Sequence, residues 1–273
     1  MSDVESGRII AIANQKGGVG KTVSEICLAR AAQHYFDAKV LVVDMDPQGN
    51  LTTAMARDPI AADEVTVADA ISPGSGVLLR EVIVPSIWEG IDLAPGGGNL
   101  SVADQKLSAA QWGREHGLRE ALAPVAADYD LVLIDNAPSL LGQLLINSLT
   151  AAGKVVLVTE ADTWSNNGLA QLGRTIAGVR SYHNPGLEIV GTVVNKWQGT
   201  TLNKDSAEDL TTGMAKHFPG VPVWDDAKIP HWTGIKTSID SGIPLDQSRT
   251  TKLRVLAADV YRPLAGRLLG VAA

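Results

Sequence analysis

A glycine-rich loop between an apolar run and an amphipathic segment is the feature that most constrains how this chain folds. The run Ile9–Ala13 predicts a buried strand, and the loop after it, residues 14–22, has the sequence NQKGGVGKT. Beyond the loop, apolar side chains recur on one face of a predicted helix, at Val23, Ile26, Cys27, Ala31 and Tyr35. A strand, a glycine loop and a helix in this order form the setting that a phosphate-binding loop requires.

The residue types in this loop suit the binding of polyphosphates. Gly17, Gly18 and Gly20 let the backbone turn its N–H groups toward phosphate oxygens, and the following helix directs its positive end at them. We expect Lys21 to reach the β- and γ-phosphates and Thr22 to ligate Mg²⁺. The alternative is a glycine-rich loop without this chemistry, but a lysine and a hydroxyl at these two places after a strand argue against it.

Further apolar runs, rich in β-branched residues, alternate with helix-like stretches and lie at Val40–Val43, Leu131–Ile134, Val155–Val158 and Ile189–Val194. Continuous rather than alternating apolarity indicates strands that are covered on both faces. We therefore predict an α/β fold, doubly wound, with a mostly parallel sheet flanked by helices. No repeat, linker or charge block divides the chain, so we expect a flexible tail over residues 1–7 and a single domain over residues 8–273.

The last part of the chain predicts a helix with one apolar face. The apolar side chains recur at three- and four-residue spacing, at Leu253, Leu256, Ala257, Val260, Tyr261, Leu264 and Leu268. Pro263 falls inside this pattern and should kink or interrupt the helix, because proline has no backbone N–H. Only Arg262 and Arg267 accompany the apolar residues near the end, which is less than a membrane-surface helix needs, so we expect this helix to pack on its own domain.

Charge and cysteine content exclude several classes of protein. The formal net charge of −7 argues against a chain that is basic all over and binds nucleic acid constitutively, but it permits a local basic face. The apolar runs are shorter than the ~20 residues of a membrane-spanning helix, and the polar, acidic start MSDVESGR is unlike a secretory signal. We therefore expect a soluble, cytoplasmic protein. The single cysteine, Cys27, cannot form an internal disulfide and is expected in the core.

Carboxylates follow two of the predicted strands. Asp44 and Asp46 end the run that begins at Val40, and Asp135 ends a later one. In a doubly wound sheet, the carboxyl ends of the strands face the ligand crevice. Because an uncompensated carboxylate at the end of a buried strand is costly, a metal ion is a natural partner for Asp135. The alternative for the first pair is that they only cap the turn that contains Pro47.

The run Ile189–Val194 is followed by Asn195, and this residue indicates which base is bound. Guanine-binding proteins of this broad class use Asn-Lys-x-Asp, whereas this chain has Gln198 where the aspartate would stand. We therefore expect adenine rather than guanine, with Asn195 pairing with the adenine amino group. An asparagine at the end of a strand can also serve only as a cap.

Two motifs carry a family resemblance. KGGVGKT at residues 16–22 and DMDPQGN at residues 44–50 resemble the deviant Walker A loop and the switch region of the ParA/MinD family of P-loop ATPases. The order and spacing of all blocks resemble ParA from Arg8 to about Gly266. Departures are Val23, where the family often has a second threonine, and Ala137, where it often has a proline.

The resemblance implies roles for individual residues. ATP would be bound by Lys16, Gly17, Gly18, Val19, Gly20, Lys21, Thr22, Val23 and Asn195. Catalysis would use Lys21 together with Lys16, which would reach the nucleotide of the partner subunit, and Asp46, which would position the attacking water. Mg²⁺ would lie at Thr22, at Asp44 through a water, and at Asp135 as the Walker B aspartate.

The resemblance alone leaves the biological function open, because this ATPase serves several processes. Cys27 alone excludes the iron-protein and arsenical-pump branches, which need further cysteines. The ParA branch implies hydrolysis of ATP, an ATP-bound homodimer, non-specific binding of double-stranded DNA in plasmid or chromosome partition, and a ParB-type partner. It also implies nucleoid association without stable membrane association. The alternatives are a MinD-like or other cargo-positioning ATPase at a membrane or scaffold, and a regulatory protein that binds nucleotide without turnover.

Basic residues in the C-terminal third are the candidates for DNA contacts, namely Lys204, Lys228, Lys236, Arg249, Lys252 and Arg254. Contacts of lysine and arginine with phosphates are sequence-independent and salt-sensitive. Each of these residues alone also fits a solvated surface charge. Residues 228–244 resemble a family stretch of the pattern IPR-x-x-R, but His231 and Gly234 stand where arginines often occur. Since only about seven residues precede the first strand, we expect no sequence-specific operator binding.

Overall fold

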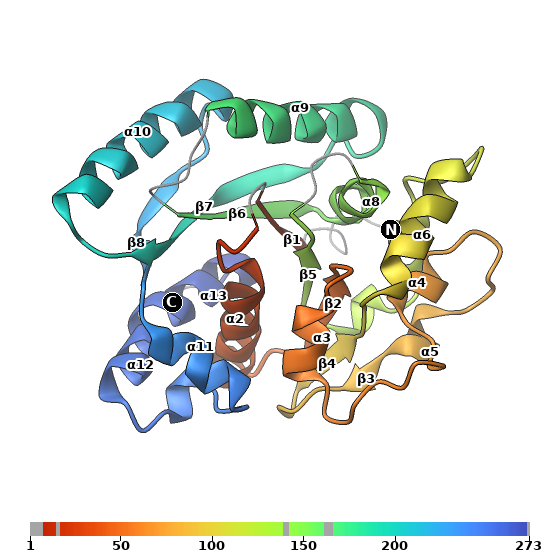
Figure 1. Ribbon diagram of the computed structural model, residues 1–273, viewed down its shortest axis with the longest axis horizontal. Coiled ribbons are helices and arrows are strands. Elements are labelled where there is room, and N and C mark those ends of the chain that lie inside the picture. The colour runs from red at the N-terminus through yellow and green to blue at the C-terminus, as the bar shows by residue number, and fades with distance from the viewer. Residues whose placement is uncertain (1–7, 15–16, 139–141, 161–165, 272–273) are drawn as a thin grey trace.

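The computed structural model describes residues 8–14, 17–138, 142–160 and 166–271, so the predicted tail, residues 1–7, lies outside the described part. At its centre is an eight-stranded sheet with the order β3-β4-β2-β5-β1-β6-β7-β8 (Figure 1). The strands are β1 (Ile9–Ala13), β2 (Val40–Met45), β3 (Val84–Pro85), β4 (Ile91–Ala94), β5 (Leu131–Asn136), β6 (Lys154–Glu160), β7 (Glu188–Trp197) and β8 (Val223–Pro230). β3 is antiparallel to β4, and the other neighbouring strands pair in parallel. The predicted doubly wound, mostly parallel sheet is confirmed.

Helices cover both faces of the sheet. On one face lie α4 (Val67–Ala70), α5 (Leu79–Val82), α6 (Asn99–Ala109), α7 (Gly117–Leu122), α8 (Gln143–Ala151), α9 (Asn166–Tyr182) and α10 (Thr201–His217). On the other lie α2 (Lys21–Phe36), α3 (Asn50–Met55), α11 (Thr233–Asp240) and the C-terminal helices, and Figure 1 shows α9 and α10 across β6 and β7 from α2 and α13. Each face of the sheet packs against its helices in a separate hydrophobic core. Ile9 and Ala11 of β1 belong to the core under α4–α10, and Ile10 and Ile12 belong to the core under α2 and the C-terminal helices. The strands are continuously apolar because both of their faces are buried.

The C-terminal helix is interrupted, as Pro263 predicts. It consists of α12 (Thr251–Leu256), a π-helical turn (Ala257–Tyr261) and α13 (Arg262–Leu269). Since Pro263 has no N–H to donate, the widened turn before it accommodates a missing bond of the helix ladder. The predicted apolar face is buried, and α13 packs against α2. Within the described ranges, no helix has the length and apolarity needed to cross a membrane.

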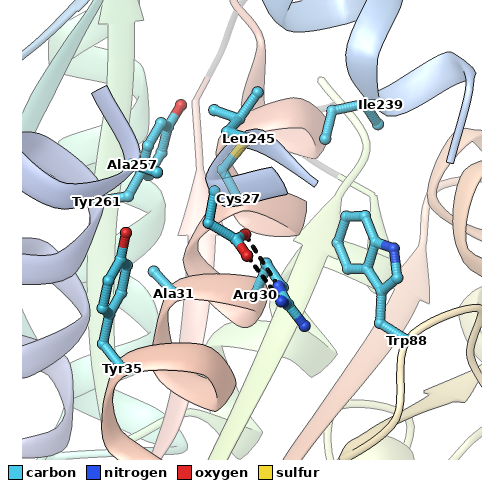
Figure 2. A pocket seen from close by; sticks show the side chains of 10 residues that line it. Cys27, Arg30, Ala31, Tyr35, Trp88, Ile239, Leu245, Ala257 and Tyr261 are labelled. Carbon is cyan, nitrogen blue, oxygen red and sulfur yellow. Dashed lines mark hydrogen bonds and ion pairs between the residues drawn. The ribbon is translucent and has the colours of Figure 1, made fainter. Parts of the chain in front are cut away.

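An ion pair fixes the C-terminal segment to α2. The guanidinium of Arg30 donates to both carboxylate oxygens of Asp246, at 3.0 and 2.7 Å, and lies 5.9 Å from the centre of the Trp88 ring. Figure 2 shows Arg30 and Cys27 at the small cavity that Asp246 also lines, and Cys27 is buried as expected of a core residue. Burial raises the pKa of the Cys27 thiol to about 12. The cavity among these side chains has a volume of only about 10 Å³, which is room for one water, so this part of the core is no ligand site.

Candidate functional site

The glycine loop lies between the end of β1 and the start of α2, at the carboxyl edge of the parallel sheet. Gly18 and Gly20 have φ angles of 78° and 86°, in the left-handed region that favours glycine. A Cβ on Gly20 would also lie 2.1 Å from the side-chain nitrogen of Asn195, so this position has no room for another residue. These left-handed glycines suit residues 17–20 to the role of a phosphate cradle. Lys16 lies outside the described residues.

Lys21, the first residue of α2, is a buried cation. Its side chain is only 6% exposed, and burial lowers the pKa of its ammonium group, while Asp135 and Asp46 oppose this shift. The next residue, Thr22, donates its hydroxyl to a carboxylate oxygen of Asp135 at 2.5 Å. The helix therefore begins with a cation and a hydroxyl that both face the acidic end of β5.

Two fully buried aspartates lie side by side where β2 and β5 end. The register of these parallel strands pairs Asp44 with Asp135. Burial raises the pKa of Asp44 to about 6, although hydrogen bonds from Thr52 lower it. Burial and then the charge of Asp44 raise the pKa of Asp135 to about 7, against the effects of Thr22 and Lys21. The sheet thus places two buried carboxyl groups directly beside the glycine loop.

Asp44 is tied to α3 by hydrogen bonds. One of its oxygens accepts from the backbone N–H and the hydroxyl of Thr52, at 2.8 and 2.7 Å, and the other accepts from the N–H of Asp46 at 3.1 Å. The Thr52 hydroxyl in turn accepts from the N–H of Gly96 at 2.9 Å. Asp44 therefore joins β2, α3 and the loop after β4, as well as lying beside Asp135 where the metal was expected.

Asp46 directly follows β2 and is almost fully buried. Its side chain accepts a hydrogen bond from the N–H of Gln48 at 2.9 Å, and its carbonyl accepts from the N–H of Gly49 at 2.9 Å. Asp46 therefore caps this turn, as the alternative interpretation expects. Its carboxylate also raises the pKa of Lys21. The structure brings Lys21, Thr22, Asp44, Asp46 and Asp135 together at one edge, as the sequence predicts.

Glu25 is a member of this cluster that the sequence analysis missed. It lies on α2, three residues after Thr22 and four after Lys21, so it shares their helix face. Its side chain is fully buried, and neither of its oxygens has a hydrogen-bond partner among the described residues. Burial, Asp135 and Asp44 all raise the pKa of Glu25 well above its ordinary value. The available signal was an acidic residue on a helix face otherwise turned to the core.

The donor set suits a hydrated Mg²⁺ ion. Asp135 has a second buried oxygen without a partner among the described residues, and Thr22 offers a hydroxyl beside it. In the described part of the chain, no three His, Cys, Asp or Glu side chains converge to hold a metal ion by themselves. Mg²⁺ commonly binds through one or two protein oxygens and keeps several waters and substrate phosphates, so these residues fit it.

Asn195 lies near the carboxyl end of β7 and contacts the glycine loop. Its amide nitrogen donates to the carbonyl of Val19 at 2.7 Å, and its amide oxygen accepts from the N–H of Lys196 at 2.8 Å. The predicted contact with adenine stays a prediction. Val23, the last residue of the predicted nucleotide set, is half-buried on α2.

The six basic candidates do not form one cluster. Lys228 and Lys252 line a shallow groove of about 680 Å³ that also includes Trp232 and the half-exposed Val255. Lys228 forms an ion pair with Asp225 at 2.8 Å, and the ammonium of Lys252 lies 4.7 Å from the centre of the Trp232 ring.

The other basic candidates lie elsewhere on the C-terminal part. Lys236 forms an ion pair with Asp240 at 2.6 Å, Arg254 donates to the carbonyl of Ser248 at 2.6 Å, and Arg249 is exposed. Lys204 belongs to α10, but its side chain lies outside the described part. The structure therefore brings together two of the predicted DNA-binding residues.

Comparison with known proteins gives consistent matches. A family model described as an AAA domain matches residues 7–189. An uncharacterized protein of Mycobacterium tuberculosis is 39% identical over 196 residues, which are 72% of this chain and 60% of that protein. The chromosome partitioning protein ParA of Caulobacter vibrioides is 35% identical over 241 residues, which cover 87% of this chain and 86% of the relative.

A solved structure matches across almost the whole chain. It is described as a cobyrinic acid a,c-diamide synthase from Mycobacterium smegmatis with bound ADP and magnesium. It is 32% identical, with a TM-score of 0.75, and the match covers 96% of this chain and 94% of that one.

We predict that replacing Glu25 by methionine stabilises the metal-free protein, and more so at high pH. The folded protein retains the Glu25 proton, which the unfolded chain releases above the ordinary pKa of 4.5, so this residue lowers stability as pH rises. Glu25→Met should therefore raise the free energy of unfolding by about 1–4 kcal/mol at pH 8, and by less at pH 5, as measured by urea unfolding.

The exposed Glu120 of α7 provides the matched control, because its replacement by methionine removes an acid that is already solvated. Glu120→Met should show no such dependence on pH. An equal effect of Glu25→Met at both pH values, or a loss of stability at pH 8, would contradict the assignment of Glu25 as a destabilising buried acid.

Proposed function

Because the chain belongs to the AAA-domain family of ParA-like P-loop ATPases, we propose that it is an ATPase of DNA partition. It binds ATP with Mg²⁺, forms a homodimer in the ATP-bound state, and then binds double-stranded DNA without sequence preference. Hydrolysis of ATP to ADP and phosphate dissolves the dimer, and a ParB-type centromere-binding protein accelerates this step. Residues 8–273 act as one ATPase domain.

One hydrogen bond is the main support for this proposal. Thr22, at the end of the glycine loop, donates its hydroxyl to Asp135 at 2.5 Å, and Asp135 lies in register with Asp44 on the neighbouring strand. A phosphate cradle, a buried lysine and a metal-binding carboxylate at one edge of a parallel sheet are the parts needed for phosphoryl transfer. The P-loop family membership and the relative with bound ADP and magnesium support the same chemistry.

The residues at the start of α2 bind and neutralise the phosphates. The backbone N–H groups of Gly17, Gly18 and Gly20 surround the phosphate oxygens, and Lys21 bridges the β- and γ-phosphates. Thr22 and Asp135 would hold Mg²⁺, and Asp44 would contact it through a water. When bound, Mg²⁺ supplies positive charge that offsets the negative charge developing on the transferred phosphate. Binding at this place also compensates the buried carboxylates.

Asp46 and Lys16 complete the catalytic machinery in this proposal. Asp46 directly follows β2, and its carboxylate orients the attacking water and accepts its proton. Lys16 reaches the nucleotide of the partner subunit, so that dimerisation and completion of the active site are one event. Replacement of Lys16 would therefore remove the ATP-bound dimer while leaving part of the nucleotide affinity.

Asn195 is compatible with recognition of adenine while it holds the loop. A side-chain amide has two N–H donors and an oxygen with two lone pairs. The contact with Val19 uses one donor, and the contact with the N–H of Lys196 uses one lone pair. One donor and one lone pair therefore remain for the ring nitrogen and the amino group of adenine.

The C-terminal part supplies the DNA-binding face in this proposal. The groove with Lys228 and Lys252 is its centre, and Lys204, Lys236, Arg249 and Arg254 are the further candidates for contacts with DNA. Ion pairs at a solvated surface contribute little to stability, so Lys228 can exchange Asp225 for a phosphate at small cost. A dimer presents two such faces, which explains how a chain with a net charge of −7 can bind DNA only in its ATP state.

We place the protein in the cytoplasm, associated with the nucleoid and without stable attachment to a membrane. The inward-facing apolar side of α13 supports this over a MinD-like reading, because that side is used for packing against α2. A cargo-positioning ATPase at a membrane or scaffold is the reading that a negative DNA experiment would favour.

The proposed function predicts DNA binding that depends on both nucleotide and salt. Binding to random-sequence duplex DNA should be tight with ATP and Mg²⁺ and weak with ADP or no nucleotide, and it should fall by at least about 10-fold between 50 and 200 mM salt. Lys252→Ala should reduce the salt slope by about 1, measured by fluorescence anisotropy. The exposed Lys106 of α6 is the matched control, and Lys106→Ala should bind like the wild type. Equal or absent binding in all three nucleotide states would refute the partition function.

The proposed role of Asp46 predicts a protein that binds but does not release. Asp46→Ala should reduce ATP turnover by about 100-fold or more and should leave a long-lived, ATP-dependent complex with DNA. Phosphate release and dissociation of DNA after removal of free ATP measure the two effects. Turnover at the wild-type rate would remove Asp46 from the catalytic site.

A further inference from the structure

The carboxyl end of β7 departs from regular strand geometry at Lys196. The pairing register with β8 shifts between Val194 and Trp197, which marks a bulge or irregularity in the strand. Lys196 has a φ angle of 54°, and Asp37 is the other described non-glycine residue with positive φ. A lysine in this left-handed region is strained, and such strain persists where the surrounding structure requires it.

The irregularity aims two consecutive side chains at the same loop. In a regular strand, Asn195 and Lys196 would point to opposite faces of the sheet. Here the amide of Asn195 donates to the carbonyl of Val19, and the ammonium of Lys196 donates to the carbonyl of Gly18 at 2.6 Å. A bulge that redirects a side chain in this way is a recurrent device next to binding sites.

The two carbonyls that are held belong to the phosphate cradle. The carbonyl of Gly18 shares its peptide unit with the N–H of Val19, and the carbonyl of Val19 shares its unit with the N–H of Gly20. A loop that turns its N–H groups toward a phosphate must turn these carbonyls away from it. A cation on the outer oxygen therefore fixes the orientation of the peptide unit and also polarises the N–H on its inner side.

Glu160 holds Lys196 in this position. It is the last residue of β6, lies in register with Asn195, and forms an ion pair with Lys196 at 2.5 Å. The side chain of Lys196 is 38% exposed, so the ion pair itself contributes little to stability. The arrangement is thus better suited to directing the ammonium than to holding the fold together.

We propose that Lys196 is a positioning residue of the glycine loop, which orients and polarises the loop's N–H groups for the phosphates of the nucleotide from the outer side of the loop. This inference rests on the proposed nucleotide binding, and it assigns Lys196 a role through the backbone of the loop. Lys196 acts through the Gly18 carbonyl, with Glu160 directing it and Asn195 holding the next peptide unit.

The test measures the affinity for nucleotides and for a phosphate chain without a base. Lys196→Met should weaken binding of ATP and ADP, each with Mg²⁺, by about 10-fold, as expected for loss of one charge-assisted hydrogen bond. Inorganic tripolyphosphate should lose affinity by the same factor, because the effect lies on the phosphates. KM for ATP should rise by a similar factor while kcat stays within threefold, and Lys196→Arg should restore most of the affinity.

A glycine variant separates this role from a merely structural one. Lys196→Gly relieves the strain of the positive φ, so its unfolding temperature should equal or exceed that of the wild type while its nucleotide affinity falls as in Lys196→Met. Lys154→Met is the matched control, since Lys154 is the first residue of β6 and lies at the opposite end of that strand from Glu160.

The outcomes are distinct. Affinities of Lys196→Met within threefold of Lys154→Met, or wild-type affinity in Lys196→Gly, would overturn the inference while leaving the proposed function intact. Weakened binding accompanied by an equally lowered stability in both variants would assign Lys196 a structural role only. A wild-type protein that binds neither nucleotide nor tripolyphosphate would overturn the proposed function itself and this inference with it.

Discussion

Buried carboxyl groups at the ends of β2 and β5 decide what this edge of the sheet can bind. Asp44 and Asp135 are adjacent and fully buried, and Glu25 adds a third buried carboxyl from α2. Lys21 is the buried cation that acts on Asp135. Carboxyl groups in such surroundings must take up protons, find hydrogen-bond donors or acquire a cation. Thr52 donates hydrogen bonds to Asp44, and Thr22 donates one to a single oxygen of Asp135.

The parallel sheet places the buried carboxyl groups next to the loop that is proposed to bind the nucleotide. β1 lies between β5 and β6, so the loop after β1 has acidic strand ends on one side and the ends of β6 and β7 on the other. The acidic side offers Asp135 and Thr22 to a metal ion. The opposite side offers Asn195 and Lys196 to the outward carbonyls of the loop. A magnesium nucleotide bound between them would meet fixed partners on both sides, which is the preorganisation that phosphoryl transfer needs.

Much of this arrangement could be predicted from the sequence, and the exceptions have physical reasons. The five continuous apolar runs correspond to β1, β2, β5, β6 and β7, because strands buried on both faces carry an unbroken signal. β4 is interrupted by Asp92, β3 has two residues, and the edge strand β8 contains the exposed Asp225 and Asp226. Such strands lack that signal, and their pairing is decided by the rest of the sheet.

The residues of the site also divide into those that the sequence predicted and those that it missed. Motif spacing predicted Lys21, Thr22, Asp44, Asp46 and Asp135, since each stands at a strand end or helix start. Glu25 was missed because burial of an acid on a helix is set by the strands against which the helix packs. Lys196 was missed because its contact depends on a strand irregularity and a positive φ, neither of which leaves a pattern in the residue types. The sequence did not show which of the scattered basic residues would line the same groove.

Thermal unfolding tests most directly whether Mg²⁺ together with a bound nucleotide compensates the buried acids. The unfolding temperature should be measured without ligand, with Mg²⁺, with ATP in EDTA, and with ATP and Mg²⁺, at pH 6 and pH 8. ATP with Mg²⁺ should stabilise the protein far more than either component alone, and more at pH 8, where Asp135 of the metal-free protein loses its proton. An unfolding temperature that is the same in all four conditions would contradict this compensation.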